Sequence, residues 1–500
     1  MALSFVQEPV DDASKVPAIT NWNPVVGYML YETTIAGLYY YKLVLEVYSE
    51  DSIDQDMLVA KIRQRRNGFK DDNNGATQRA RAFFDLRSVI NSLLVDTVND
   101  QNDSSPPYKS IHLVGHNQAT LPFSKNGDNT KFYGDNTTSK TQILAVKVRG
   151  YQHYSETVSA SPIDITTDAV TSTKFYMAAS LPLEIARSTD VTPPAYVQGT
   201  AFQTYTYNSP FASKRFLSDV IESAGSVVSG TQLRNHIQED DYHTIAFLNG
   251  YDNFNSNINK IEIKFYSITG ASLNSGTITN TSANGGAVPD TGASLTNAQK
   301  LLYFGVGAGN LDTQTRNTDL QPSEAGNTNW AYYTVQGLNT AGDGKSGTYY
   351  FIKQDGSCKG FKVRRLAWRN SLGGYDYFNF KMKSSQNVKV NRNTYSTLLG
   401  NYNDELYTYE NWGRGKSTRQ TTAVLEETLN TDWITEQDAV LLENLIKSTR
   451  VEMIENSDTT YTVGVMVTDS SFVRKTQAND GMRIQYTIKI EYANPLNTNS

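Results

Sequence analysis

The nine-residue stretch IQYTIKIEY, residues 484–492, decides the fold class of this chain. Its apolar and aromatic residues stand at every second position and alternate with Gln485, Thr487, Lys489 and Glu491. A period of two places the apolar side chains on one face of a β-strand and the polar side chains on the other. An antiparallel sheet with one buried face is the structure that this pattern favours.

The same alternation recurs along the chain. Residues 39–47 and 461–467 carry Tyr, Leu or Val at every second position. Within 39–47, Lys42 and Glu46 fall on the opposite face, which we expect to be exposed to solvent. Further strands are predicted at residues 25–31, 142–149, 243–248, 258–267, 349–353, 361–368 and 375–382. Many alternating strands predict a mainly β chain with several antiparallel β-sandwich-like domains and a few short helices.

Two short helices are predicted from their first residues. Asp85 is a good N-cap for a helix that continues to Val95, where apolar residues follow at helical spacing. Thr435 begins a variant of the capping box in which Asp438 takes the position usually held by Glu or Gln. A helix near 435–448 follows from this cap.

The length of 500 residues predicts about three domains of roughly 150 residues each. Residues 1–24 are polar and proline-rich, and they predict an extended N-terminal arm. The predicted domains are residues 25–200 with one helix near 85–95, residues 201–345, and residues 346–500 with the helix near 435–448. A long polar loop is expected over 271–296, either as a surface loop or as a hairpin that docks on a neighbour. Residues 384–422 form a second polar stretch, to which no strand is assigned.

Composition excludes several classes of protein. The formal net charge is −6, so a large nucleic-acid footprint and sequence-specific nucleic-acid binding are not expected. Cys358 is the single cysteine, which excludes an internal disulfide. No apolar run approaches ~18 residues, so no membrane span is expected. The 31 Tyr residues, 11% aromatic content and abundant Asn, Thr, Ser and Gly suit a β-rich protein with wide polar surfaces.

Motifs that imitate cofactor sites do not meet the chemical requirements. Residues 342–346 and 413–417 resemble a phosphate-binding loop, but the required first glycine is replaced by Asn339 and Glu410. Both segments are therefore interpreted as turns. His112 and His116 are four residues apart, yet no acidic residue accompanies them as a zinc-protease motif requires. No cofactor or metal is predicted.

An acidic cluster offers the best candidate for catalysis. Glu239, Asp240 and Asp241 lie between His236 and His243. Glycoside cleavage uses two carboxyl groups in opposed roles, so Glu239 and Asp241 could serve a polysaccharide-degrading enzyme. Adjacent acidic residues more often form a solvated loop, because neighbours on a strand point to opposite faces. The chain is therefore expected not to be an enzyme, and the degrading enzyme is the second alternative.

Residues 361–380 read as a strand, a tight Gly-Gly turn and a second strand. Three arginines interleave with aromatic residues here, which suits either an anionic partner or acidic residues on a neighbouring subunit; the second reading is favoured. The candidates for this structural or interaction role are Arg364, Arg365, Trp368, Arg369, Gly373, Gly374 and Tyr375.

The hairpin over 368–376 resembles one found in virion proteins of tailed bacteriophages. The C-terminal block is similar to the same proteins, with its helix at 433–448 followed by strands at 463–468 and 484–494. The resemblance implies a structural role in a tail, baseplate or neck, and it carries over no catalytic residue. It implies a subunit of the virion, assembled in the host cytoplasm as one copy of a symmetric ring beside other virion proteins. The first alternative is a receptor- or glycan-binding protein at the tail tip, because Tyr, Trp and Asn suit a host-surface glycan.

Overall fold

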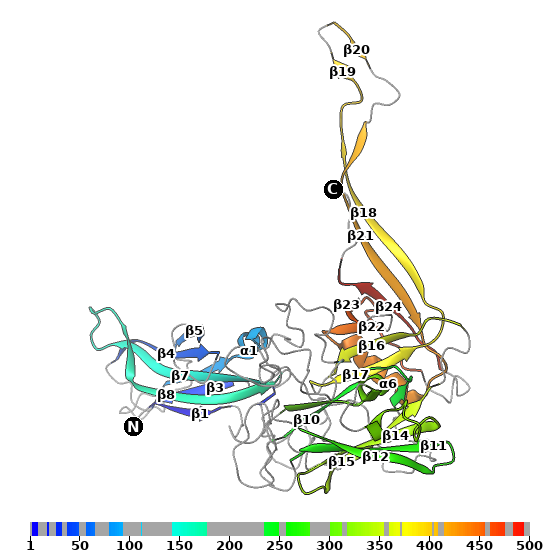
Figure 1. Cartoon of the computed structure of the whole chain (residues 1–500). Coiled ribbons are helices and arrows are strands. Elements are labelled where there is room, and N and C mark those ends of the chain that lie inside the picture. The colour runs from blue at the N-terminus through cyan, green and yellow to red at the C-terminus, as the bar shows by residue number, and fades with distance from the viewer. Residues whose placement is uncertain are drawn as a thin grey trace. The chain divides into compact units, whose positions relative to one another are not determined.

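Figure 1 shows the chain as a computed structural model, which divides into two compact units. The first unit comprises residues 1–354 and 370–376, and the second comprises 355–369 and 377–500. The structure describes residues 3–8, 18–19, 27–32, 38–49, 57–65, 80–93, 112, 143–177, 235–249, 257–280, 301–312, 318–354, 360–370, 373–402, 405–408, 415–455, 461–475 and 484–494. The predicted boundary near residue 201 and most of the predicted arm lie outside these ranges.

The first half of unit one contains two sheets. Their elements are β1 (Ser4–Gln7), β2 (Ala18–Ile19), β3 (Gly27–Glu32), β4 (Tyr39–Tyr48), β5 (Leu58–Arg65), β6 (Ala80–Asp85), α1 (Arg87–Leu93), β7 (Ile143–Ser155) and β8 (Ile163–Met177). Strands β1-β3-β6 form one sheet and β2-β8-β7-β4-β5 form the other. All pairs among them are antiparallel except β2 with β8.

These two sheets share one hydrophobic core. Leu43 and Leu45 of β4 are fully buried in the same cluster as Tyr28 and Leu30 of β3. The Tyr28 hydroxyl lies 2.8 Å from the hydroxyl of Tyr176 on β8, which satisfies both groups inside the core. Packing one sheet against another in this way is the sandwich arrangement that the alternating strands predicted.

The second face of β4 differs from the prediction. Glu46 was expected to face solvent with Lys42, but Glu46 is only 5% exposed, and Val44 on the same face is fully buried. The hydroxyls of Tyr48 and Tyr151 each donate to the Glu46 carboxylate at 2.8 Å, and Lys61 lies 3.1 Å from it. Glu46 is buried because these partners replace its water.

The second half of unit one contains two further sheets. Its elements are β9 (Asn235–Ile237), β10 (Thr244–Leu248), β11 (Lys260–Ser267), β12 (Ser272–Thr279), β13 (Leu301–Gly305), α5 (Ala308–Asp312), the 3₁₀ helix η8 (Thr318–Leu320), β14 (Trp330–Leu338) and β15 (Gly344–Lys353). Strands β10 and β13 pair, and β12-β11-β14-β15-β9 form a five-stranded sheet. The rings of Phe247 on β10 and Phe304 on β13 pack edge to face. Phe247 also lies close to Gly337 of β14, in the five-stranded sheet.

The prediction of a loop over 271–296 is wrong for the first part of that segment. Ser272–Thr279 forms β12, which pairs antiparallel with β11 of its own chain. The Ser, Thr and Gly composition concealed this strand because an edge strand needs few apolar residues: most of β12 is exposed or half-buried. Residues 281–296 lie outside the described ranges.

The second unit is built on a seven-stranded sheet of order β17-β16-β22-β23-β24-β21-β18. Its elements are β16 (Arg364–Arg369), β17 (Tyr375–Phe380), β18 (Ser385–Ser396), β19 (Asn401–Tyr402), β20 (Tyr407–Thr408), β21 (Lys416–Asn430), α6 (Glu436–Lys447), β22 (Val451–Glu455), β23 (Tyr461–Val467) and β24 (Thr487–Tyr492). The first two residues of β17 are grouped with unit one.

Helix α6 confirms the predicted capping box. The Thr435 hydroxyl accepts from the Asp438 backbone N–H, and the Asp438 carboxylate accepts from the Thr435 N–H. Ser448 follows the last turn and donates to the carbonyl of Arg369 on β16 at 2.8 Å. The predicted mainly β fold of the sandwich-like class is thus confirmed.

Candidate functional sites

The predicted hairpin over 361–380 is confirmed as β16 and β17, and two of its three arginines, Arg364 and Arg365, are buried. Arg364 donates to Glu427 at 2.7 Å and to Glu455 at 2.6 Å, both within the second unit. Arg365 donates to the amide oxygen of Asn379 at 2.7 Å and lies over the ring of Tyr377. The acid partners of Arg364 therefore belong to its own chain.

The remaining residues of the hairpin shape its turn and its interior. Trp368 is fully buried, Tyr375 is 3% exposed and Arg369 is half-buried. Gly373 adopts a φ of 89°, a conformation in which a side chain is strained. The Asn370 side chain accepts from the Gly374 N–H at 3.0 Å and closes the turn. A role for this hairpin at an interface stays a prediction.

The two candidate carboxylates of the acidic cluster 239–241 have different surroundings. Asp241 is buried and caps a turn by accepting from the Gln238 N–H at 2.8 Å. Glu239 is exposed and forms an ion pair with Lys353. The ring of the nearby His243 packs edge to face on Phe351. These contacts are structural ones.

Other sequence candidates find ordinary surroundings. His112 is buried against the ring of Tyr375, whereas His116 and Cys358 lie outside the described residues. The segment 342–346 begins in the turn between β14 and β15 and continues into β15 from Gly344. In this turn the Asn339 side chain accepts from the N–H groups of Gly342 and Asp343. Across the described ranges, no group of three potential metal ligands comes together.

The most prominent feature of the second unit is a long two-stranded ribbon made by β18 and β21, which projects from the seven-stranded sheet (Figure 1). All twelve residues of β18 are exposed, and β18 is the edge strand of the sheet. Strand β24 pairs with Glu426–Asn430 of β21. Among the described strands, the ten residues of β21 that precede Glu426 pair with β18 alone. At the usual rise of a β-strand, this two-stranded part of the ribbon is about 30 Å long.

The two faces of the ribbon differ in polarity. Val388 pairs with Leu425 and Val390 with Ala423, so these four side chains share one face. Val388 and Val390 are 52% and 39% exposed. The opposite face carries mainly polar residues, among them Asn387, Asn391 and the ion pair of Lys389 with Glu426. We call the four apolar residues 388, 390, 423 and 425 the ribbon stripe.

A buried ion cluster anchors the base of the ribbon. Glu427 of β21 is 1% exposed and accepts from Arg364, from the Tyr492 hydroxyl at 2.6 Å and from Gln386 at 3.1 Å. Burial alone would raise the pKa of Glu427, but hydrogen bonds from Tyr492, Gln386 and Arg364 hold it below the ordinary value. The ribbon therefore projects from a base that these buried hydrogen bonds anchor. Its far end exposes Tyr395, Leu398, Leu399, Leu406 and Tyr407.

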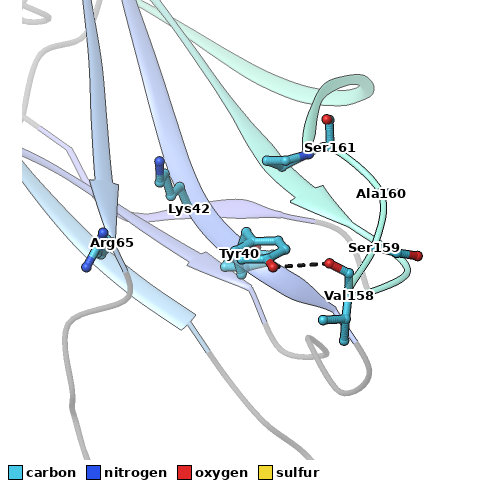
Figure 2. Close-up of a pocket in the computed structure, with 9 residues that line it drawn as sticks. Tyr40, Lys42, Arg65, Val158, Ser159, Ala160 and Ser161 are labelled. Carbon is cyan, nitrogen blue, oxygen red and sulfur yellow. Dashed lines mark hydrogen bonds between the residues drawn. The ribbon is translucent and has the colours of Figure 1, made fainter.

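A second candidate site lies in the first unit, at the start of β4. Tyr40 has a φ of 56°, which is strained for a residue other than glycine, and the β4–β7 register shifts between Tyr39 and Lys42. The Tyr40 hydroxyl donates to the Val158 carbonyl at 3.1 Å, in the turn that joins β7 to β8 (Figure 2). Such bulges re-aim side chains and are frequent beside functional sites.

This bulge opens a groove of about 740 Å³ between β4, the end of β5 and the turn of residues 158–162. Lys42 and Arg65 both line it, from neighbouring strands (Figure 2). Tyr41 lines it too and stacks on Tyr154. Burial, together with the nearby charges of Glu32 and Tyr154, raises the pKa of Tyr41 well above its usual range, so this phenol stays neutral. We call this the basic groove.

Sequence reasoning missed both features. In residues 384–422 the alternation of Val388 and Val390 with Asn and Lys was the available signal, but two apolar residues are too few to define a strand. The basic groove joins residues over 90 positions apart, and nothing in the sequence brings Arg65 beside residues 158–162. These sites depend on tertiary structure.

No protein-family model matches the chain, and no curated protein matches it significantly. Among the described residues, no helix has the length and apolarity that a membrane-spanning helix requires. The function therefore has to be argued from the ribbon and the basic groove.

Proposed function

We propose that this chain is a structural subunit of a tailed-phage particle, and that it works through protein–protein contacts with copies of itself in a ring. The single observation that carries the proposal is the exposure of β18 along its whole length. The proposal assigns the chain no catalytic step and places it in the virion, beside other virion proteins.

The ribbon is costly to maintain for a protein that works alone. A two-stranded hairpin is at best marginally stable in water, since it has no third strand or helix to cover its apolar face. An exposed edge strand also offers its free N–H and C=O groups to another chain. Both costs are offset when a neighbour covers the ribbon, by strand addition or by packing on the ribbon stripe.

The charge of the ribbon favours another copy of the same chain as that neighbour. Residues 385–430 contain five Lys or Arg and five Asp or Glu, a balance of zero, whereas the whole chain carries −6. Copies can therefore bring their ribbons together without the repulsion that their net charge would otherwise cause. Closed symmetry then uses the same contact in every subunit.

The test compares two double variants on the two faces of β18. Val388→Lys with Val390→Lys places charges in the ribbon stripe, and Asn387→Lys with Asn391→Lys places the same charges on the polar face. All four positions are exposed, so both variants should fold as the wild type does. Sedimentation velocity and negative-stain microscopy should show rings or oligomers for the wild type and the polar-face variant, and monomers for the stripe variant.

Two results would contradict the proposal. Sedimentation of the wild type as a monomer at high concentration would mean that copies of the chain do not bind one another. Equal assembly of both double variants would mean that the ribbon stripe is not the contact.

A second candidate function, recognition of a glycan, is favoured by the basic groove and does not depend on assembly.

A further inference from the structure

The basic groove holds two cations that the fold places directly opposite each other. Lys42 and Arg65 are register partners in the antiparallel pair of β4 and β5, so their side chains leave the same face of the sheet. Like charges at directly opposed positions destabilise a sheet. A pair of like charges side by side at a groove is the arrangement expected where both charges bind an anionic ligand.

The neighbouring residues of β5 show that the fold can neutralise this face where it needs to. Lys61 and Arg63 pair with Asp164 at 2.8 and 3.3 Å. Lys61 also pairs with Glu46. Neither Lys42 nor Arg65 has an ion-pair partner among the described residues. The groove therefore carries two cationic side chains, Lys42 and Arg65, in a chain of net charge −6.

The rest of the groove defines more than an anion site. Tyr40, held at a strained φ by the bulge, and Tyr41 supply aromatic surface. The opposite wall carries the hydroxyls of Ser159 and Ser161 together with backbone polar groups. An inorganic anion would use the cations alone, whereas a sugar uses all three: its apolar C–H face on a tyrosine ring, its hydroxyls on the turn, and a carboxylate on the cations.

We propose that the basic groove binds an acidic sugar, a uronic-acid or sialic-acid unit of a glycan, with Lys42 and Arg65 on its carboxylate. The groove is open along the surface, so the sugar can be an internal unit of a longer polysaccharide. The guanidinium of Arg65 suits a bidentate carboxylate contact, and the ammonium of Lys42 adds a second point charge. No bond is made or broken in this role.

The test uses a trigalacturonate probe and its methyl ester, which has the same shape without the charge. Calorimetric titration at low salt should give saturable binding of the acid and at least tenfold weaker binding of the ester. Lys42→Met and Arg65→Gln should each weaken binding of the acid at least tenfold. Arg63→Gln is the matched control, since it removes a charge from the same face of β5 outside the groove, and it should bind as the wild type does.

A second measurement separates binding from folding. Because Lys42 and Arg65 repel each other in the free protein, Lys42→Met and Arg65→Gln should raise the melting temperature without ligand while they weaken binding of the acid. A lowered melting temperature in both variants would mean that the pair is structural and would overturn the proposal. Equal binding of the acid and the ester would also overturn it. So would a protein that binds inorganic phosphate or a polyglutamate peptide but binds neither trigalacturonate nor sialyllactose. These outcomes leave the ribbon proposal unaffected, because the groove variants lie outside the ribbon.

Discussion

At the scale of single residues, the buried charged side chains Arg364 and Glu46 are each surrounded by partners. Arg364 lies between Glu427 and Glu455, and Glu46 lies beneath two tyrosines and a lysine. Removing one partner from such a cluster leaves an uncompensated charge, which costs more than the pair itself contributes. Arginines near aromatic residues in the sequence thus indicated a charged site, but the partners turned out to be intramolecular.

Asp164 should make the first unit sensitive to acid. Burial alone would raise the pKa of Asp164, but hydrogen bonds from Lys61 and His153 and the charges of Lys61 and Arg63 lower it to about 2. A lowered folded-state pKa stabilises the fold at pH values above the unfolded-state pKa of ~3.9, and that stabilisation is lost as the pH falls toward 2.

We therefore expect the melting temperature to fall between pH 4 and pH 2 and to fall less steeply in Asp164→Asn. Circular dichroism melts at a series of pH values measure both slopes. Asp85 provides a comparison, because its ion pair with Arg87 also lowers its pKa but is more exposed to solvent, which screens it. Asp85→Asn should therefore change the slope less than Asp164→Asn. Equal slopes for the wild type and Asp164→Asn would remove Asp164 from the acid response.

At the scale of elements, local signals determined helix α6 and tertiary contacts determined the ribbon. The capping box of α6 could be read in the sequence because it depends on residues three positions apart. Strand β18 could not be read in the same way. Its partner β21 lies 20 or more residues further along the chain. The polar residues of β18 adopt a strand because they pair with β21.

Removal of the α6 cap should cost about 1 kcal/mol. Thr435→Ala leaves the Asp438 N–H without its acceptor and removes the hydroxyl bond to the Asp438 carboxylate, while the bond from the Thr435 backbone N–H remains. N-cap losses typically have this magnitude. Thr435→Ser keeps the hydroxyl and should stay close to the wild type. Urea unfolding followed by circular dichroism measures the difference. A Ser variant as unstable as the Ala variant would mean that the methyl group, not the cap, stabilises this turn.

At the scale of the whole molecule, the second unit is completed by strands from two parts of the chain. Strand β16 stands between β17 and β22 in the sheet and carries the fully buried Trp368. A fragment of residues 377–500 lacks β16, so its sheet loses an interior strand and its core loses that indole. A fragment of residues 355–500 retains all seven strands.

We expect the 355–500 fragment to unfold cooperatively and the 377–500 fragment to lack a cooperative transition. Thermal melts by near-ultraviolet circular dichroism distinguish them, because fixed aromatic packing is lost when a core does not form. Cooperative unfolding of both fragments would mean that β16 is dispensable for this sheet.

Short-range patterns by themselves determined the fold class, the strands with alternating apolar residues and the capped helix, because these depend on neighbours within a few positions. Tertiary structure alone decided that Glu46 is buried, that 272–279 is an edge strand, that β18 projects with its partner, and that Lys42 meets Arg65. Each of these depends on which segments of the folded chain lie alongside and which faces or edges they leave open. A period of two specifies that a strand has two faces, but it does not specify what covers either one.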